Sequence, residues 1–209
     1  MKLPKLLPIL ITLVLPSLSW ASITFTLGNN PQPGEENILL NSGETGGLVH
    51  GTTNQSGLTV IFASETQVLS EPSSGQARIE ATNNGSQVGL SDLSISLANG
   101  GTFTDAIFNP FIGGTVGTPG GTATIIVDTD ITSTFSYTLG NGQNFLTIVA
   151  TGGEVISDII ISYPTGFTDL RQPRISGATI PTVPDGGATL PLLGAGVLSL
   201  ALLRRKLAS

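Results

Sequence analysis

Glycine-containing turn segments interrupt residues 22 to 180 at short intervals, and this spacing leaves room for strands but not for long helices. The segments combine Gly with Asn, Pro, Ser or Thr: NNPQPG, NSGETGG, EPSSG, NNG, ANGG, GTPGG, GNGQN and ATGGE. No amphipathic helical pattern lies between them. The spacing therefore predicts an all-β fold of ten to twelve strands, either a sandwich or a barrel, of which we favour an antiparallel two-sheet β-sandwich that is jelly-roll-like.

Apolar residues alternate with polar ones in the segments between these turns, as expected for half-buried strands. The clearest cases are ITFTL (Ile23, Phe25 and Leu27 inward), ARIEA (Ile79 inward, Arg78 and Glu80 outward), LSISL at 93–97 and FSYTL at 135–139. The segments TVIFA, TIIV and DIIIS are apolar on both faces, which predicts central strands. Asn141-Gly142 between two strand patterns predicts a hairpin in STFSYTLGNGQNFLTIVA.

The charge of the chain is unevenly distributed. Three arginines and thirteen acids fall between Ser22 and Pro184, which gives this segment a net charge of −10, whereas the whole chain has −6. Phosphate binding needs clustered Lys and Arg, so nucleic acid is excluded as a partner. The chain has no cysteine, so disulfide and thiolate chemistry are excluded as well. We expect no cofactor.

Residues 1–21 have the pattern of a secretory signal peptide. Lys2 and Lys5 precede an apolar run at 6–15, and small residues flank Trp20. This pattern predicts recognition by signal peptidase, with cleavage between Ala21 and Ser22. The alternative is an uncleaved membrane anchor, but the apolar run is short for a membrane span and prolines interrupt the segment.

The last residues contain the same two features in reverse order, an apolar segment followed by cations. A linker and motif at 181–187 precede an apolar segment at 188–203 and a basic tail at 204–209. The motif consists of Val183, Pro184, Asp185, Gly186 and Gly187, and the cations are Arg204, Arg205 and Lys206. The cations predict a transmembrane helix that stops transfer and leaves residues 22–180 outside. A buried core helix would explain the leucines but not three consecutive cations.

The order VPDGG, apolar segment and RRK resembles the PEP-CTERM family of sorting signals, in the variant that begins Val-Pro-Asp. The common motif of that family is Val-Pro-Glu-Pro, from which this chain departs at Asp185 and Gly186. The resemblance covers about residues 183–209 and the signal peptide. It implies a Gram-negative bacterium in which an exosortase, a membrane processing enzyme, acts on the tail, often alongside exopolysaccharide production. The implied location is the inner membrane, followed by the cell surface or the extracellular space.

Residues 22–180 contain few groups that could carry catalysis or bind a metal. His50 is the only histidine, which leaves no partner for a His-containing triad or a typical zinc site. Glu35 and Glu36 follow PQPG and are expected to be ordinary solvated residues of a turn. Asp128 and Asp130 could contribute to a calcium site, but VDTDIT lacks the further acids and the Gly of a calcium loop, so we expect a polar loop end and no metal.

Two further segments could bind a sugar. DLRQPRI places Asp169 beside Arg171 and Arg174, and these arginines either pair with structural carboxylates or bind a sugar acid. FNPFIGG presents Phe108 and Phe111, which either belong to the core or stack on sugar rings. The pairing and core interpretations are favoured.

We therefore predict a non-enzymatic surface or matrix protein that carries a sorting signal. The alternative is a carbohydrate-binding module with a polysaccharide partner, and a hydrolase built on the sandwich is a weaker third option. Coplanar exposed aromatic side chains would favour the module, whereas two carboxylates facing each other across a cleft would favour the hydrolase.

Overall fold

The computed structural model describes residues 21–72 and 77–181, and it is almost entirely β-structure. These residues form fifteen strands and one short 3-10 turn at Ala98–Gly100, and every strand pairing is antiparallel. The prediction of an antiparallel all-β fold is confirmed, with more strands than the ten to twelve expected. Within the described ranges, no helix is long and apolar enough to cross a membrane. The expected signal peptide and transmembrane helix lie almost wholly outside them.

One layer of the fold, which we call layer A, has the strand order β1–β13–β10–β15. Its strands are β1 (Ser22–Leu27), β13 (Leu146–Thr151), β10 (Asp105–Phe111) and β15 (Asp169–Ser176). The free edge of β15 pairs with two strands in turn. Leu170 and Arg171 pair with β7 (Arg78–Asn83), whereas Arg174 and Ile175 pair with β2 (Glu36–Leu39).

The second layer, layer B, has the order β2–β4–β5–β9–β14–β11–β12. Its remaining strands are β4 (Leu48–Thr53), β5 (Thr59–Ala63), β9 (Leu90–Leu97), β14 (Asp158–Phe167), β11 (Thr122–Asp128) and β12 (Ser133–Thr138). Because β2 pairs with both β15 and β4, the two layers are joined into one continuous sheet rather than separate as predicted. The segment TVIFA forms β5, whereas TIIV and DIIIS form parts of β11 and β14, and each of these strands has a partner on both sides, as predicted.

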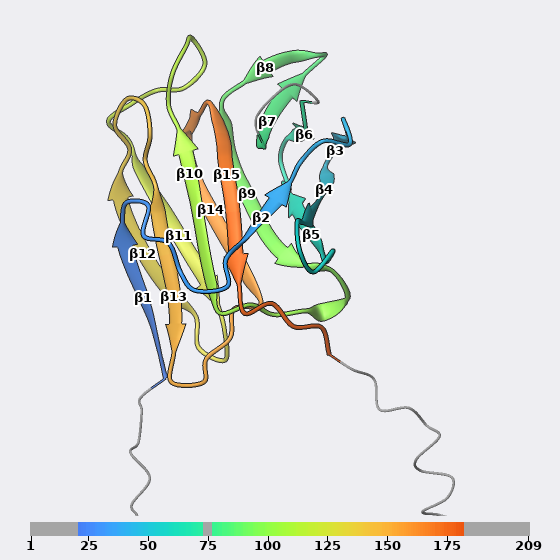
Figure 1. The fold of residues 1–209 in the computed structure, drawn as a ribbon. Helices are drawn as coiled ribbons and strands as arrows, with labels where there is room; N and C mark the ends of the chain where they lie inside the picture. The colour runs from blue at the N-terminus through green and yellow to red at the C-terminus, as the bar shows by residue number, and fades with distance from the viewer. Residues whose placement is uncertain (1–20, 73–76, 182–209) are drawn as a thin grey trace, which may run out of the picture.

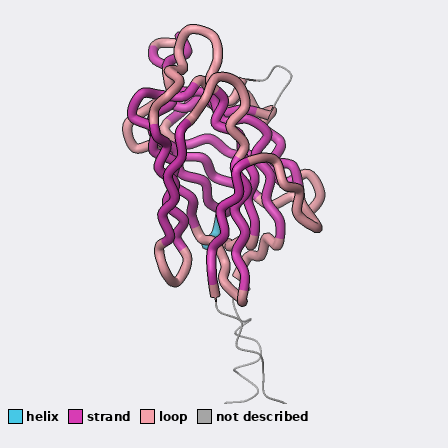
Figure 2. Tube along the Cα trace, turned by 90° about the vertical axis from the view of Figure 1, so that its left-hand side faces the viewer, coloured by secondary structure: helices cyan, strands magenta, loops and turns pink. Residues whose placement is uncertain are grey.

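A small extension sits at one end of the molecule (Figure 1). It contains β3 (Thr45–Gly46), β6 (Val68–Ser70), β7 and β8 (Ser86–Val88) in the order β3–β6–β7–β8. Asn84 and Gly85 connect β7 to β8 with φ values of 50° and 78°. Two successive positive φ angles are typical of a tight two-residue hairpin, so the NNG signal corresponds to a real turn. In Figure 2 the strands run along the length of the domain, and most of the loops lie at its two ends.

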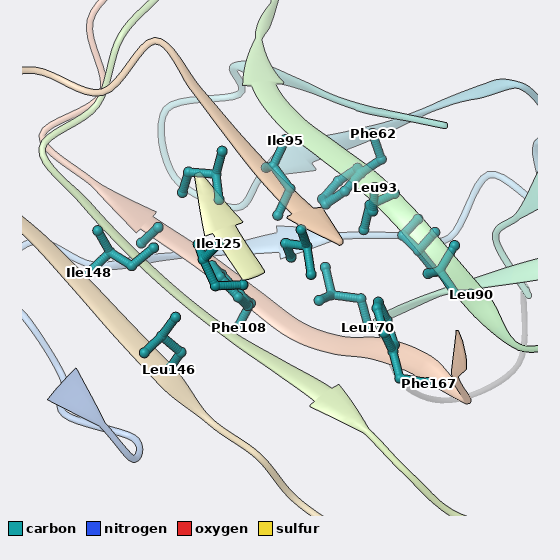
Figure 3. Packing of buried hydrophobic residues seen from close by; sticks show 14 of the residues in the cluster. Phe62, Leu90, Leu93, Ile95, Phe108, Ile125, Leu146, Ile148, Phe167 and Leu170 are labelled. Carbon is teal, nitrogen blue, oxygen red and sulfur yellow. The ribbon is translucent and has the colours of Figure 1, made fainter. Parts of the chain in front are cut away.

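The hydrophobic core lies between the two layers. Leu93 and Ile95 of β9 and Ile125 of β11 pack toward Phe108 of β10 and the other core side chains of layer A (Figure 3). The alternation predicted for LSISL is present, with Leu93, Ile95 and Leu97 buried. Phe108 is 1% exposed, so it belongs to the core, as favoured from the sequence.

Aromatic side chains close the gap between the outermost strands of the two layers. Phe25 of β1 stacks on Phe135 of β12 with ring centroids 4.9 Å apart, and Phe135 stacks in turn on Tyr137 at 5.8 Å. No backbone ladder joins β1 to β12. The sheet is therefore nearly closed, like a barrel, with this aromatic seam in place of the last set of backbone hydrogen bonds.

The loop between β1 and β2 crosses the outer face of layer A (Figure 1). Asn30 donates its backbone N–H to Thr147 Oγ1 at 3.1 Å, and Thr147 Oγ1 donates to the Gly28 carbonyl at 2.9 Å. Glu35 forms an ion pair with Arg174, and both side chains are largely buried. Glu35 is thus held in a structural ion pair and is not the solvated turn residue expected from the sequence.

Two local predictions are wrong. The hairpin around Asn141-Gly142 does not form, because β12 lies in layer B and β13 in layer A, and the intervening segment crosses between the layers. Asn144 holds this crossing, because its side-chain amide donates to the carbonyls of Pro110, Gly140 and Gly142. Leu27 was expected to point inward with Phe25, but it is 61% exposed at the end of β1.

Candidate functional site

The outer face of layer A carries a polar cleft where β7, β10 and β15 lie side by side. We call it the arginine cleft, and it encloses about 270 Å³. Its lining residues are Arg78, Glu80, Gln87, Phe111, Thr168, Asp169, Arg171 and the loop residues 113–116. In strands β7 and β15 the neighbouring residues Ile79 and Leu170 point into the core, so the charged residues beside them point outward.

Arg171 is fixed in position by two interactions. Its Nε and Nη2 atoms donate to the two carboxylate oxygens of Asp169 at 2.5 and 2.9 Å, and the Asp169 side chain is 2% exposed. The guanidinium carbon lies 3.5 Å from the centre of the Phe111 ring, a cation–π contact. A bidentate carboxylate and an aromatic support leave the guanidinium little freedom to reorient.

A second arginine–carboxylate pair lies on the adjacent strand. Arg78 is directly opposite Arg171 in the β7–β15 register. The Nε atom of Arg78 lies 2.7 Å from Glu80 Oε1, but the contact does not have the geometry of a hydrogen bond. Burial raises the pKa of Glu80, and although Arg78 opposes this, the nearby Asp169 adds to it. Arg78 and Glu80 therefore leave more of their hydrogen-bonding capacity unused than Arg171 and Asp169 do.

Side chains from three segments hold the loop at the rim of the cleft in place. Thr168 Oγ1 donates to the Gly113 carbonyl at 2.7 Å and accepts the Gly113 N–H at 2.8 Å. Gln87 of β8 donates to the Thr168 carbonyl at 3.1 Å. Tyr163 anchors the far end of the same loop, because its hydroxyl donates to the Thr118 carbonyl at 2.6 Å. The loop thus has a defined position at the edge of the cleft.

A β-bulge in β15 lies next to the cleft. Arg171 pairs with Asn109 and Arg174 pairs with Ile107, so β15 has one extra residue in this interval. Gln172 accommodates it with a φ of 50°, which is uncommon for a residue other than glycine. The bulge coincides with the point where β15 changes partner from β7 to β2. Bulges redirect side chains and occur often beside functional sites.

The arrangement is suited to binding rather than to hydrolysis. Two cations balance two carboxylates, so the cleft is close to neutral within an acidic domain. Both guanidinium groups and the Glu80 carboxylate have donors or acceptors beyond those used in the ion pairs, and such planar groups can bind adjacent hydroxyls in pairs. Asp169 is engaged through both oxygens by Arg171, so it is not free to act as the nucleophile or base of a glycosidase.

The structure separates the other sequence candidates from the cleft. His50 lies on β4, exposed, with its Nδ1 atom 3.0 Å from Glu44 Oε2. The hydrogen bonds from the His50 side chain and backbone lower the pKa of Glu44. Glu36 lies on β2, and hydrogen bonds from the backbone of Ser56 and Gln55 lower its pKa. These residues have local structural partners, which accounts for their positions.

Asp128 and Asp130 do not converge on a metal site. Asp128 ends β11 and pairs in register with Asp158 of β14, whereas Asp130 lies in the following turn. Within the described part of the chain, no group of three or more His, Asp or Glu side chains is arranged to hold a metal ion. Burial, followed by the charge of Asp128, raises the pKa of Asp158 to about 6.

Sequence reasoning identified half of the cleft. Arg171, Asp169 and Phe111 were candidates, and the preference for a structural carboxylate is correct, because Arg171 pairs with Asp169. Phe111 does not stack freely outward, since Arg171 covers its ring. Arg78 and Glu80 were placed on an outward face but not connected to Arg171. The signal that could have linked them is the shared pattern of opposite charges two residues apart, in ARIEA and DLRQ.

The predicted sorting signal belongs to the part of the chain that follows residue 181. Val183 to Gly187, the apolar segment and the three terminal cations lie outside the described residues. Ala21 and Ser22, between which cleavage is predicted, are described, and β1 begins at Ser22.

No protein-family model and no curated protein matches the chain. Among solved structures, a family 29 carbohydrate binding module is 11% identical, with 75% of this chain and 87% of the other covered, at a TM-score of 0.25. A variant of such a module, complexed with mannohexaose, is 13% identical, with 77% and 91% covered and a TM-score of 0.23. TM-scores this low leave the fold and the ligand of this chain to be inferred from its own residues.

Proposed function

We propose that this is an exported, non-enzymatic surface or matrix protein whose jelly-roll-like β-domain binds a polysaccharide in the arginine cleft. The observation that carries the proposal is the pre-organised Arg171, which is held by Asp169 and supported by Phe111 beside a second, incompletely satisfied Arg78–Glu80 pair. Sugar hydroxyls both donate and accept hydrogen bonds, so they match a surface that offers guanidinium donors and carboxylate acceptors side by side.

The cleft provides rigid, directional hydrogen-bonding groups but little apolar area. The N–H groups of Arg171 that do not face Asp169 remain able to donate, and Gln87 and Thr168 add neutral polar groups at the rim. Because most of these groups are already fixed by contacts within the protein, ordering them costs little free energy when a ligand binds. The expected ligand is therefore a hydroxyl-rich chain that lies across the outer face of β7, β15 and β10.

The proposal includes the sorting signal at the C-terminus. The tail from Val183 to Lys206 would hold the exported domain at the inner membrane until an exosortase-type enzyme processes it, after signal peptidase has acted at the N-terminus. The support for this step is the sequence order of motif, apolar segment and cations. A polysaccharide-binding domain that is delivered to the cell surface would then meet its ligand where exopolysaccharide accumulates.

The test is binding of neutral polysaccharides to the protein and to two matched arginine variants. Arg171→Lys keeps the charge but loses the bidentate pair and the planar stack, so we expect binding through the cleft to weaken by about tenfold or more. Arg174→Lys is the control, because Arg174 pairs with Glu35 outside the cleft. Affinity electrophoresis in gels containing β-glucan, mannan or xylan measures both variants. Equal retardation of Arg171→Lys and the unmodified protein would show that the cleft is not the binding site.

A further inference from the structure

The outer face of layer B contains a second hollow, and none of the three arginines of residues 21–181 lines it. We call it the serine groove. It encloses about 460 Å³ over β5, β9 and β14, and its lining includes Ala63, Asp92, Ser94, Asp158, Ile160 and Ser162. Ser94 pairs in register with Ala63 on one side and with Ile160 on the other. The small side chains on neighbouring strands form the floor, and this is why the sheet is hollow there.

One end of the groove has a fixed hydrogen-bond acceptor. Asp92 Oδ2 accepts the Ser64 hydroxyl at 2.8 Å and the Glu65 backbone N–H at 3.0 Å, and Oδ1 accepts the Thr66 hydroxyl. Burial alone would raise the pKa of Asp92, but these donors outweigh it and lower the pKa. The same contacts hold the Asp92 carboxylate in one orientation.

The other end of the groove has a carboxyl group that lacks a cationic partner. Asp158 pairs in register with Asp128, a like charge, and no salt bridge to either carboxylate occurs among the described residues. Like charges opposite one another on paired strands are unfavourable. Hydroxyl donors from a ligand would stabilise this pair. Asp92 and Asp158 are four positions apart along the β9–β14 ladder, or about 13 Å, a length that holds more than one sugar ring.

The composition of the groove restricts the class of ligand. Its charged lining residues, Glu65, Asp92 and Asp158, are all acidic, so an anionic polymer would be repelled. Ile160 and Ala63 provide an apolar floor for the C–H face of a sugar, while Ser94 and Ser162 provide hydroxyls. This mixture fits a neutral glycan.

We infer that the serine groove is a second carbohydrate site, which takes a neutral glycan and lies on the face of the domain opposite the arginine cleft. This inference rests on the proposed function of the cleft. Two sites that face away from each other cannot both bind the same short stretch of a chain. The protein therefore holds two glycan chains at once and cross-links them, as a matrix component would.

The test is the binding stoichiometry of the full-length protein, purified in detergent. Isothermal titration with cellohexaose, mannohexaose and xylohexaose, each used separately, should give two sites per chain for at least one of them. Ser94→Trp fills the groove and should reduce the number to one, and Arg171→Ala should do the same through the cleft. The control Thr134→Trp, at an exposed position of β12, should keep two sites. Melting curves verify that each variant is folded.

The outcomes show which of the two proposed sites fails. One site in the unmodified protein that Arg171→Ala removes and Ser94→Trp leaves intact would overturn the second site and keep the first. One site that only Ser94→Trp removes would overturn the arginine cleft and, with it, cross-linking. No binding of any of the three hexasaccharides would overturn both. If the double variant, which combines Ser94→Trp with Arg171→Ala, still binds at two sites, both proposals are overturned as well.

Discussion

At the scale of single residues, charge pairing organises the outer faces of this protein. Each of the three arginines between residues 21 and 181 contacts a carboxylate: Arg78 with Glu80, Arg171 with Asp169, and Arg174 with Glu35. The sequence allowed this pairing to be predicted, because thirteen acids surround three cations. It did not identify the partners, since Arg174 and Glu35 are far apart along the chain and meet only when the β1–β2 loop crosses layer A.

Asp158 provides a residue-scale prediction on stability. Its pKa rises from 3.8 to about 6 in the folded protein, through burial and then through Asp128, so the fold favours the protonated form. The associated stability is fully present below about pH 3.8 and is lost as the pH rises through 6. Asp158→Asn removes the charge, so we expect a higher melting temperature than the unmodified protein at pH 7 and a much smaller difference at pH 4.

Asp130→Asn is the matched control, because Asp130 lies in the exposed turn after β11. Its melting temperature should follow that of the unmodified protein at both pH values. A lower melting temperature for Asp158→Asn at pH 7 would mean that the Asp158 carboxylate is stabilising, contrary to its burial beside the like charge of Asp128.

At the scale of elements, local pattern predicted the strands better than their partners. Alternation in LSISL and FSYTL identified the buried faces of β9 and β12, because alternate side chains of a strand point to opposite faces. Asn141-Gly142 was expected to join two paired strands, but the two strands beside it lie in different layers. Which strand pairs with which depends on contacts such as those of Asn144 with Pro110, 34 residues away, and a local pattern does not contain them.

The aromatic seam supports an element-scale prediction. Phe25 and Phe135 are the stacked contact across the β1–β12 gap, where no backbone ladder is present. Both rings are partly buried, so Phe25→Ala should lower the free energy of unfolding by roughly 1–2 kcal/mol, less than a fully buried Phe→Ala. In a double-mutant cycle with Phe135→Ala, the coupling energy should be about 0.5–1.5 kcal/mol, measured by urea unfolding.

Leu27→Ala tests whether the effect belongs to the seam or to β1 as a whole. Leu27 is on the same strand but exposed, so its substitution should change the free energy of unfolding by less than about 0.5 kcal/mol. Additive effects of Phe25→Ala and Phe135→Ala, with no coupling, would mean that the stack does not hold the two edges together.

At the scale of the whole molecule, the pairing of strands that are distant in the sequence explains why only half of the arginine cleft was predicted. Arg78 and Arg171 are directly opposite on paired strands, yet 93 positions apart in the sequence. Taken separately, each of their strand segments, RIE and DLR, has the pattern of a solvent-facing charge pair. Such pairs are common on the outer face of a sheet. Only the antiparallel pairing of β7 with β15, together with the end of β10, makes them one cleft.

The sorting proposal is also tested on the whole molecule. Deleting residues 183–209 should release the exported domain into the soluble periplasm or the medium, because the apolar segment and its cations are gone. Replacing Pro184 and Asp185 by Ala should keep the chain in the membrane fraction with its tail intact. Cell fractionation with mass spectrometry in the native host measures both. Normal trimming of the alanine variant would contradict recognition of the Val183–Gly187 motif.

The most direct test of the central claim is a map of where a glycan touches the protein. The measurement is an NMR titration of the ¹⁵N-labelled protein with a soluble fragment of a polysaccharide that it retains in affinity gels. The account predicts concentration-dependent shifts at the backbone amides of Arg78, Gln87, Phe111, Gly113 and Arg171, which line the cleft. An unperturbed cleft at saturation, with shifts confined to other surfaces, would contradict it.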